Sequence, residues 1–216
     1  MLGLSTILLS QSIQGIFVFG SGTIVLLLVK FWNKVRIRNT FLLFVTSFGS
    51  ISLLGLINIG PLRNLLFQDS NLYRWDYWRA AFKAILRKPL TGYGPDQFAS
   101  AYSVLRDDVA IQRRSTVVSD NAHNWYLQIG STYGLLFLAL FLTLLFVITR
   151  KSIDNLRVAE SRNFGSLLLA LWLGYLAQSF IGVENSTISG WGWSFAGLII
   201  ALSFKENRLD VKNQSK

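Results

Sequence analysis

The chain of 216 residues contains no cysteine and only one histidine. The lack of cysteine excludes disulfides, zinc–thiolate sites, haem–thiolate sites and cysteine nucleophiles. A single histidine also excludes a metal site built from several imidazoles, and we expect neither a metal nor a cofactor. Charged residues make up 15% of the chain, whereas a soluble domain usually carries about 25%. An ordinary water-soluble globule is therefore not expected.

Hydrophobic residues are abundant instead, at 51% of the chain. Five apolar runs are long enough to cross a hydrocarbon core of about 30 Å. They cover residues 7–29, 41–61, 125–148, 164–182 and 188–204. We therefore predict an all-α, polytopic membrane protein with about five transmembrane helices. Residues 1–61 hold two spans, 62–124 form one large extracytoplasmic loop with short helices, 125–204 hold three spans, and 205–216 form a basic cytoplasmic tail.

The net charge of +10 is interpreted through this topology. In a soluble chain such a charge would suggest nucleic acid, but here we expect the lipid bilayer as partner and no nucleic acid. Residues 30–39, 150–163 and 205–216 are basic and alternate correctly with five spans, so they can all be cytoplasmic. The N-terminus then lies outside. The loop is also basic, and its arginines are candidates for function.

A loop helix is predicted over residues 72–86, with N-cap residues at 69–71. A projection at roughly 100° per residue separates a charged stripe from an apolar side. The stripe, expected to face solvent or lipid headgroups, contains Asp76, Arg79, Lys83 and Arg87. Arg74 falls among the apolar residues, where a charge is costly unless it is paired or faces a polar cavity. Arg74 is therefore either paired or directed at a polar cavity, or it snorkels, since it is near the helix start.

A proline and two glycines follow this helix. Pro89 ends the helix, and Gly92 and Gly94 indicate a turn, for which a tight connector is the simpler interpretation. The carboxylates of Asp107 and Asp108 are adjacent and point apart, and no third carboxylate lies nearby in the sequence. A metal site is therefore not predicted there.

The end of the loop carries the single histidine. Residues 119–121 can cap the third span, which places His123 in its first helical turn. The positive end of the helix dipole disfavours a charged imidazolium there, and a neutral imidazole is what a general base requires. An interfacial or capping histidine is the simpler alternative. Arg114, in the most polar part of the loop, either attracts an anionic substrate or faces solvent.

Several short elements, taken in order, resemble the O-antigen ligase/polymerase family. They are Arg74-x-x-x-Trp78, Pro89-Leu90-x-Gly92-x-Gly94-x-x-x-Phe98, His123-Asn124-x-x-Leu127-Gln128, and Gly134-Leu135-Leu136 at a span. The resemblance covers roughly residues 70–149. Members of this family join or polymerise glycans carried on polyprenyl diphosphate, at the outer face of the bacterial cytoplasmic (inner) membrane.

The resemblance implies roles for particular residues. His123 corresponds to the histidine needed for transfer, and Arg74 to the arginine that is a candidate for binding the diphosphate. Arg79 and Arg114 are possible helpers at the diphosphate. The supporting residues of this interpretation are Trp78, Asn124, Gly92 and Gly94.

Two departures from the family pattern matter. Many members carry an acidic residue shortly after His-Asn, where this chain has residues 131–133, Ser-Thr-Tyr. Members are also about twice as long, so this chain resembles a C-terminal half whose N-terminal half is missing.

We therefore predict transfer or polymerisation of a polyprenyl-diphosphate-linked glycan onto the hydroxyl of a glycan or lipid-linked acceptor, in cell-surface polysaccharide biosynthesis. The alternative is a non-enzymatic membrane subunit or an inactive remnant in an envelope polysaccharide system. A transporter ranks lowest, because the predicted spans contain no ionisable residue between their ends.

Overall fold

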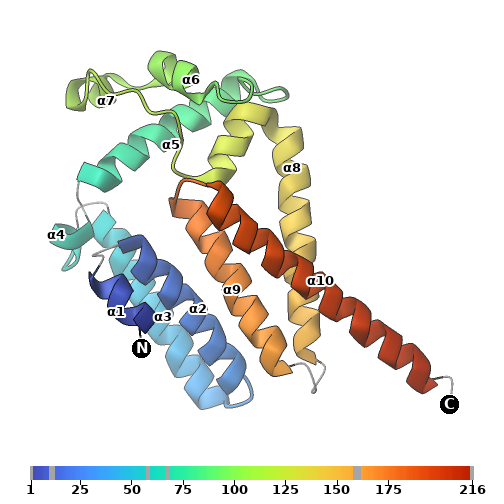
Figure 1. Cartoon of the computed structure of the whole chain (residues 1–216). Coiled ribbons are helices and arrows are strands. Elements are labelled where there is room, and N and C mark those ends of the chain that lie inside the picture. Colours follow the sequence, from blue (N-terminus) through green and yellow to red (C-terminus); the bar gives the residue numbers. More distant parts are fainter. Residues whose placement is uncertain (1, 10–12, 57–58, 67–68, 158–161, 215–216) are drawn as a thin grey trace. The chain divides into compact units, whose positions relative to one another are not determined.

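The computed structural model describes residues 2–9, 13–56, 59–66, 69–157 and 162–214, and all regular elements in these ranges are helices (Figure 1). In chain order they are α1 (Leu2–Leu9), α2 (Ile13–Phe31), α3 (Val35–Leu56), α4 (Arg63–Leu66), α5 (Asp69–Arg87), α6 (Phe98–Leu105), α7 (Asp108–Arg113), α8 (Trp125–Asp154), the 3-10 helix η1 (Asn155–Arg157), α9 (Arg162–Ile181) and α10 (Ser186–Gln214). The all-α prediction is confirmed for these residues.

Among the described residues, three helical stretches are long and apolar enough to cross a membrane. They are Trp125–Arg157, Arg162–Ile181 and Ser186–Phe204, and they correspond to the third, fourth and fifth predicted spans. The apolar part of α2, Gly15–Phe31, is shorter. The predicted first span, 7–29, falls on two separate helices, α1 and α2, and residues 10–12 between them lie outside the described residues. The first two spans and the loop topology stay predictions.

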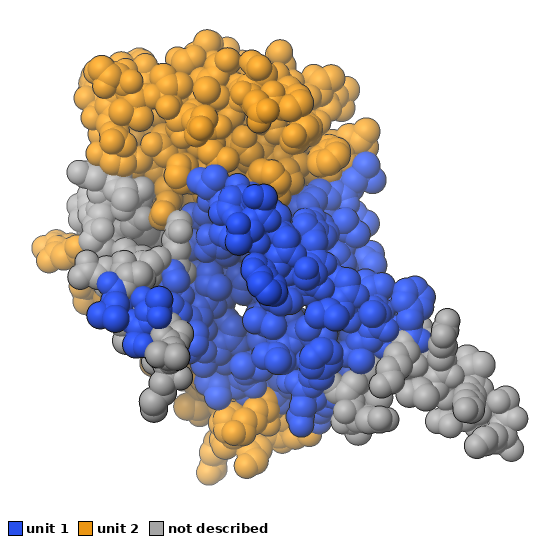
Figure 2. Space-filling model, viewed as in Figure 1, with its two compact units in different colours: residues 1–29, 139–216 blue, residues 30–138 orange. Residues whose placement is uncertain are grey.

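The chain divides into two compact units (Figure 2). Unit 1 contains residues 1–29 and 139–216, and unit 2 contains residues 30–138. In unit 1 the buried Asn155 ties the end of α8 to α10, since its Nδ2 donates to the carbonyl of Ile199 at 3.0 Å. The indole of Trp172, fully buried in α9, donates to Thr149 Oγ1 of α8 at 2.9 Å. These polar contacts connect the three apolar helices where side chains in lipid have few other partners.

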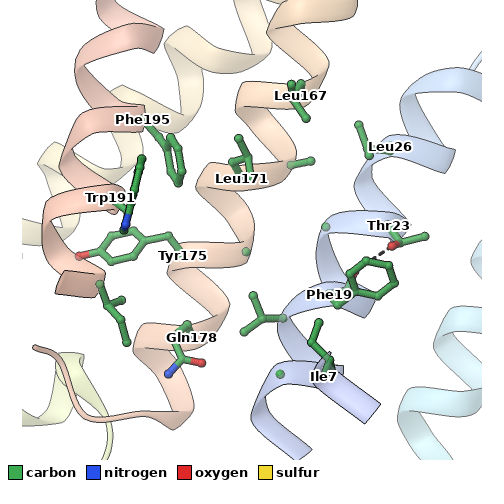
Figure 3. A pocket seen from close by; sticks show the side chains of 17 residues that line it. Ile7, Phe19, Thr23, Leu26, Leu167, Leu171, Tyr175, Gln178, Trp191 and Phe195 are labelled. Carbon is green, nitrogen blue, oxygen red and sulfur yellow. Dashed lines mark hydrogen bonds between the residues drawn. The ribbon is translucent and has the colours of Figure 1, made fainter. Parts of the chain in front are cut away.

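Unit 1 also contains an apolar cavity of about 660 Å³ (Figure 3). Residues of α1, α2, α9 and α10 line it, among them Phe19, Leu171 and Trp191, with Gln178 and Tyr175 as its main polar side chains. The α9–α10 turn is polar, because the carboxylate of Glu184 accepts hydrogen bonds from three hydroxyl groups. The donors are Tyr175, Ser179 and Ser189.

Unit 2 is built around the packing of α5 against α6. Small side chains on α5 allow the close approach of larger rings on α6. The buried cluster contains Tyr77, Ala80, Ala81, Ala84, Phe98, Ala101, Tyr102, Leu105 and Ala122. The predicted loop helix is thus confirmed, although α5 begins at Asp69. The prediction that residues 69–71 form its N-cap is wrong, because they lie inside the helix.

The third predicted span is not one straight helix, since α8 breaks at Gly134. This glycine has φ 84° and ψ 173°, a backbone region that is essentially restricted to glycine. A Cβ added there would lie 2.1 Å from the carbonyl oxygen of Leu90. Figure 1 shows α8 (yellow) changing direction close to its N-terminal end. The kink thus requires both the glycine backbone and the absence of a side chain.

Three main-chain hydrogen bonds join the turn after α5 to this break. The amides of Tyr93 and Gly94 donate to the carbonyls of Ser131 and Thr132 at 2.8 Å each, and the amide of Leu135 donates to the carbonyl of Pro89 at 2.6 Å. Gly92 has φ 62°, and a Cβ on it would lie 2.4 Å from the carbonyl carbon and oxygen of Thr132. The Gly92–Gly94 connector therefore docks backbone to backbone on α8, which its spacing alone did not predict.

We expect the substitution Gly134→Ala to lower the free energy of unfolding by at least about 1–3 kcal/mol, because alanine cannot adopt this backbone without strain. The overlap with Leu90 adds to that strain. Denaturant unfolding in detergent, followed by tryptophan fluorescence, measures the effect. Gly197→Ala in α10 is the matched control, since its Cβ would meet nothing within 4 Å. Equal stability of the two variants would contradict the docking.

Candidate active site

The candidate site begins at the N-terminus of α8, where Asn124 is the N-cap. Its Oδ1 accepts the amide of Leu127 at 3.1 Å, which satisfies a donor that the helix leaves free. The prediction that residues 119–121 cap this helix is wrong. His123 consequently lies just before the N-cap and not in the first turn, although it remains at the positive end of the helix.

His123 itself has a left-handed backbone, with φ 52°. This conformation is uncommon for a residue with a side chain, and two side chains hold the segment in place. Asn121 Oδ1 accepts the amide of His123 at 2.8 Å, and Gln128 Oε1, from α8, accepts the amide of Ala122 at 2.9 Å. Backbone strain of this kind is concentrated at functional sites.

The imidazole of His123 stacks on the ring of Tyr77 from α5. The ring centroids are 5.3 Å apart and the planes differ by 24°. Tyr77 in turn packs edge-on against Tyr102 of α6, with centroids 5.4 Å apart. Both tyrosines are buried. Tyr77 was not among the residues predicted for the site, although it occurs three residues after Arg74 and so projects to the same side of the helix.

Arg74 and His123, which are distant in the sequence, act on each other electrostatically. Burial lowers the pKa of His123 below its usual 6.5, the charge of Arg74 lowers it further, and Asp120 partly opposes this. Burial also lowers the pKa of the Arg74 guanidinium. The imidazole is therefore neutral near pH 7 and lies in a field that favours an anion. The structure brings these two predicted site residues together.

The predicted charged stripe of α5 is not uniformly solvated. The Asp76 side chain is only 3% exposed, and its carboxylate binds Arg79 at 2.7 Å and Arg113 at 2.5 Å. The expectation of a solvent- or headgroup-facing Asp76 is therefore wrong. The reason lies in tertiary structure, because Arg113 comes from α7, which is far away in the sequence.

A second carboxylate completes this ion-pair group. Asp107 binds Arg79 at 3.3 Å and also binds Lys83, and its hydrogen bond to Lys83 lowers the pKa of Asp107. Arg79 is thus engaged by two carboxylates, which makes it a weak candidate for binding a diphosphate. Within the described ranges, no group of three or more acidic, histidine or cysteine side chains could hold a metal ion.

The remaining predicted residues have structural contacts. The Arg114 guanidinium lies over the ring of Tyr73, 4.2 Å from its centroid, and so next to the start of α5, one residue before Arg74. Trp78 is partly buried against the α5–α6 core and packs edge-on against Trp75, with centroids 5.3 Å apart. Residues 131–133 occupy the stretch where many family members carry an acidic residue. In this chain the carbonyls of Ser131 and Thr132 bind the turn after α5.

The long apolar helices are those of a helical membrane protein. Residues 1–142 match the profile of the O-antigen ligase family, so the chain belongs to this family of bacterial membrane proteins. A protein of Rickettsia prowazekii (strain Madrid E), named as a candidate polysaccharide ligase, is 31% identical over 145 residues. The match covers 65% of this chain and 33% of that relative.

The protonation of His123 can be measured directly because it is the sole histidine. Diethyl pyrocarbonate modifies the neutral imidazole, and ultraviolet absorbance follows the product. We expect the midpoint of the rate–pH profile to lie below 6.5, the usual value. The pKa of His123 is lower in the folded chain than in the unfolded chain, so the unfolded chain binds the imidazole proton more tightly. The contribution of His123 to the free energy of unfolding therefore falls as the pH drops below 6.5.

Two charge variants test the cause. Arg74→Gln should raise the midpoint, since a repelling charge is removed, and Asp120→Asn should lower it, since an attracting charge is removed. Asp108→Asn, an exposed change on α7, is the control. If the midpoint of the rate–pH profile is the same in Arg74→Gln as in the unmodified chain, the charge of Arg74 does not affect the imidazole.

Proposed function

We propose that this chain takes part in joining a polyprenyl-diphosphate-linked glycan to an acceptor hydroxyl, at the outer face of the bacterial inner membrane. The acceptor is a growing glycan or another lipid-linked molecule. The family membership supports polysaccharide ligation as the class of reaction. The relative from Rickettsia prowazekii, named as a candidate polysaccharide ligase, supports the same class.

The observation that carries the proposal is that a half-buried arginine acts on a neutral histidine. The charge of Arg74 lowers the pKa of His123, and burial lowers the pKa of both groups. A neutral imidazole can accept a proton, and a desolvated guanidinium interacts strongly with a diphosphate. The electrostatic effect of Arg74 on His123 supports assigning both chemical functions of the transfer to one site.

The proposed step is a substitution at the anomeric carbon of the donor sugar. The acceptor oxygen forms a bond to this carbon while the bond to the diphosphate oxygen breaks. The diphosphate leaves with the electron pair, and Arg74 offsets its developing charge. His123 takes the proton of the acceptor hydroxyl. Tyr77 holds the imidazole plane by stacking, and Asn121 holds its backbone.

Arg114 is the second cation we assign to the donor. Its guanidinium lies over Tyr73 at the start of α5, and no carboxylate binds it among the ion pairs of the described residues. Arg79 is left out of this role, because Asp76 and Asp107 already engage it. A non-enzymatic role in an envelope polysaccharide system is the alternative, since the chain matches 33% of its relative's length.

The test is expression in a strain that lacks its own surface-glycan ligase or polymerase, with the glycan ladder as readout. We expect the chain to restore a ladder and His123→Ala to remove it, because loss of a general base slows transfer by about 10²–10⁴-fold. Arg74→Lys should retain more activity than Arg74→Ala, because it keeps a charge but loses the bidentate geometry.

Gln112→Ala serves as control, since Gln112 is exposed on α7. It should give the ladder of the unmodified chain. A ladder that persists in His123→Ala would overturn the assigned base. If the unmodified chain is inserted in the membrane and restores no ladder, the non-enzymatic alternative is favoured.

A further inference from the structure

Helix α5 has an exposed apolar stripe on the side away from its buried alanines. The exposed fractions of Trp75, Phe82 and Leu86 are 42%, 56% and 65%. On a helical projection these three residues fall within about 40° of each other. The opposite side of the helix holds the residues that pack against α6. Unit 2 therefore leaves these three apolar side chains uncovered.

Basic side chains lie along one edge of this stripe. Arg79 and Lys83 are about half exposed, at 48% and 46%, although carboxylates bind their charged ends. Arg87 follows one helical turn later, is exposed, and has no ion pair within the described ranges. A helix with aromatic and aliphatic residues on one side and lysine and arginine next to them is typical of a bilayer interface.

We propose that α5 lies in the membrane interface, with Trp75, Phe82 and Leu86 in the lipid and Arg87 on anionic headgroups. The stripe is apolar and its flank is cationic, so an anionic lipid surface is complementary to both. Tryptophan suits this depth because its ring is apolar and its N–H is polar. Trp75 also packs against Trp78, which extends the aromatic surface across the helix.

The docking has a consequence for the candidate site. Arg74 is adjacent to Trp75 in α5, so a helix held at the interface keeps the guanidinium at headgroup depth. A lipid-linked diphosphate lies at this same depth. This consequence rests on the proposed function, whereas the docking itself does not, and the experiment below has no readout of transfer.

The absence of cysteine allows single-cysteine labelling. The variants Phe82→Cys and Leu86→Cys, each carrying an environment-sensitive nitrobenzoxadiazole fluorophore, are reconstituted as the full chain in phosphatidylcholine nanodiscs. Some of the lipids carry a nitroxide quencher. Ser103→Cys is the control, because Ser103 is exposed on α6. We expect several-fold greater quenching at positions 82 and 86 than at 103, together with a blue-shifted emission.

Anionic lipid tests whether Arg87 binds the lipid headgroups. Adding phosphatidylglycerol should increase quenching at position 86, and Arg87→Gln should remove this increase. Gln112→Glu on α7, which changes the net charge by the same amount, should keep it.

Three results would overturn the proposal. Equal quenching at positions 82, 86 and 103 would show that the stripe does not enter lipid. A blue shift without quenching by nitroxide lipids would indicate a protein neighbour, such as a second copy of the chain. An unchanged response to phosphatidylglycerol in Arg87→Gln would show that Arg87 does not bind the headgroups.

Discussion

The packing of unit 2 depends on the break of α8 at Gly134, where main-chain hydrogen bonds join α8 to the turn after α5. A helix that continued through this residue would bond its own carbonyls, and no acceptors would remain for the turn after α5. The break frees the carbonyls of Ser131 and Thr132, and the amides of Tyr93 and Gly94 take them. Unsatisfied main-chain groups are costly when buried, so the two segments hold each other. The docking places α5 against the start of α8, where His123 lies.

Among the basic residues of unit 2, those bound by carboxylates differ from Arg74. Arg79, Lys83 and Arg113 are held by the carboxylates of Asp76 and Asp107, and they tie α5 to the segment around α7. Arg74 instead lies partly buried, and its charge acts on His123. The same chain therefore uses some arginines to connect helices, whereas Arg74 acts on the charge state of His123. Helical spacing set Arg74 apart, but it did not show that Arg113 binds Asp76 or that Asp107 binds Arg79 and Lys83, because these partners are distant in the chain.

The predictions from the sequence succeeded where a signal is local. Helical periodicity found α5 and isolated Arg74 from the charged stripe, and apolar length found α8, α9 and α10. The order of short motifs indicated the O-antigen ligase family, which the comparison confirms. Predictions failed where the outcome depends on which residue forms a particular hydrogen bond or ion pair in the folded chain. Asn124 caps α8 in place of residues 119–121, and Asp76 is buried because α7 supplies Arg113.

The amino-acid sequence is enough to predict a helical membrane protein of this family, with a lone histidine and an isolated arginine. These follow from composition, periodicity and motif order, which can be read along the chain without knowing which distant segments meet. The folded chain adds that the charge of Arg74 acts on His123 and that Tyr77 stacks on the imidazole. It also shows that α8 bends at Gly134. Each depends on segments that approach through space, and the free energy of such contacts arises only when the chain is folded.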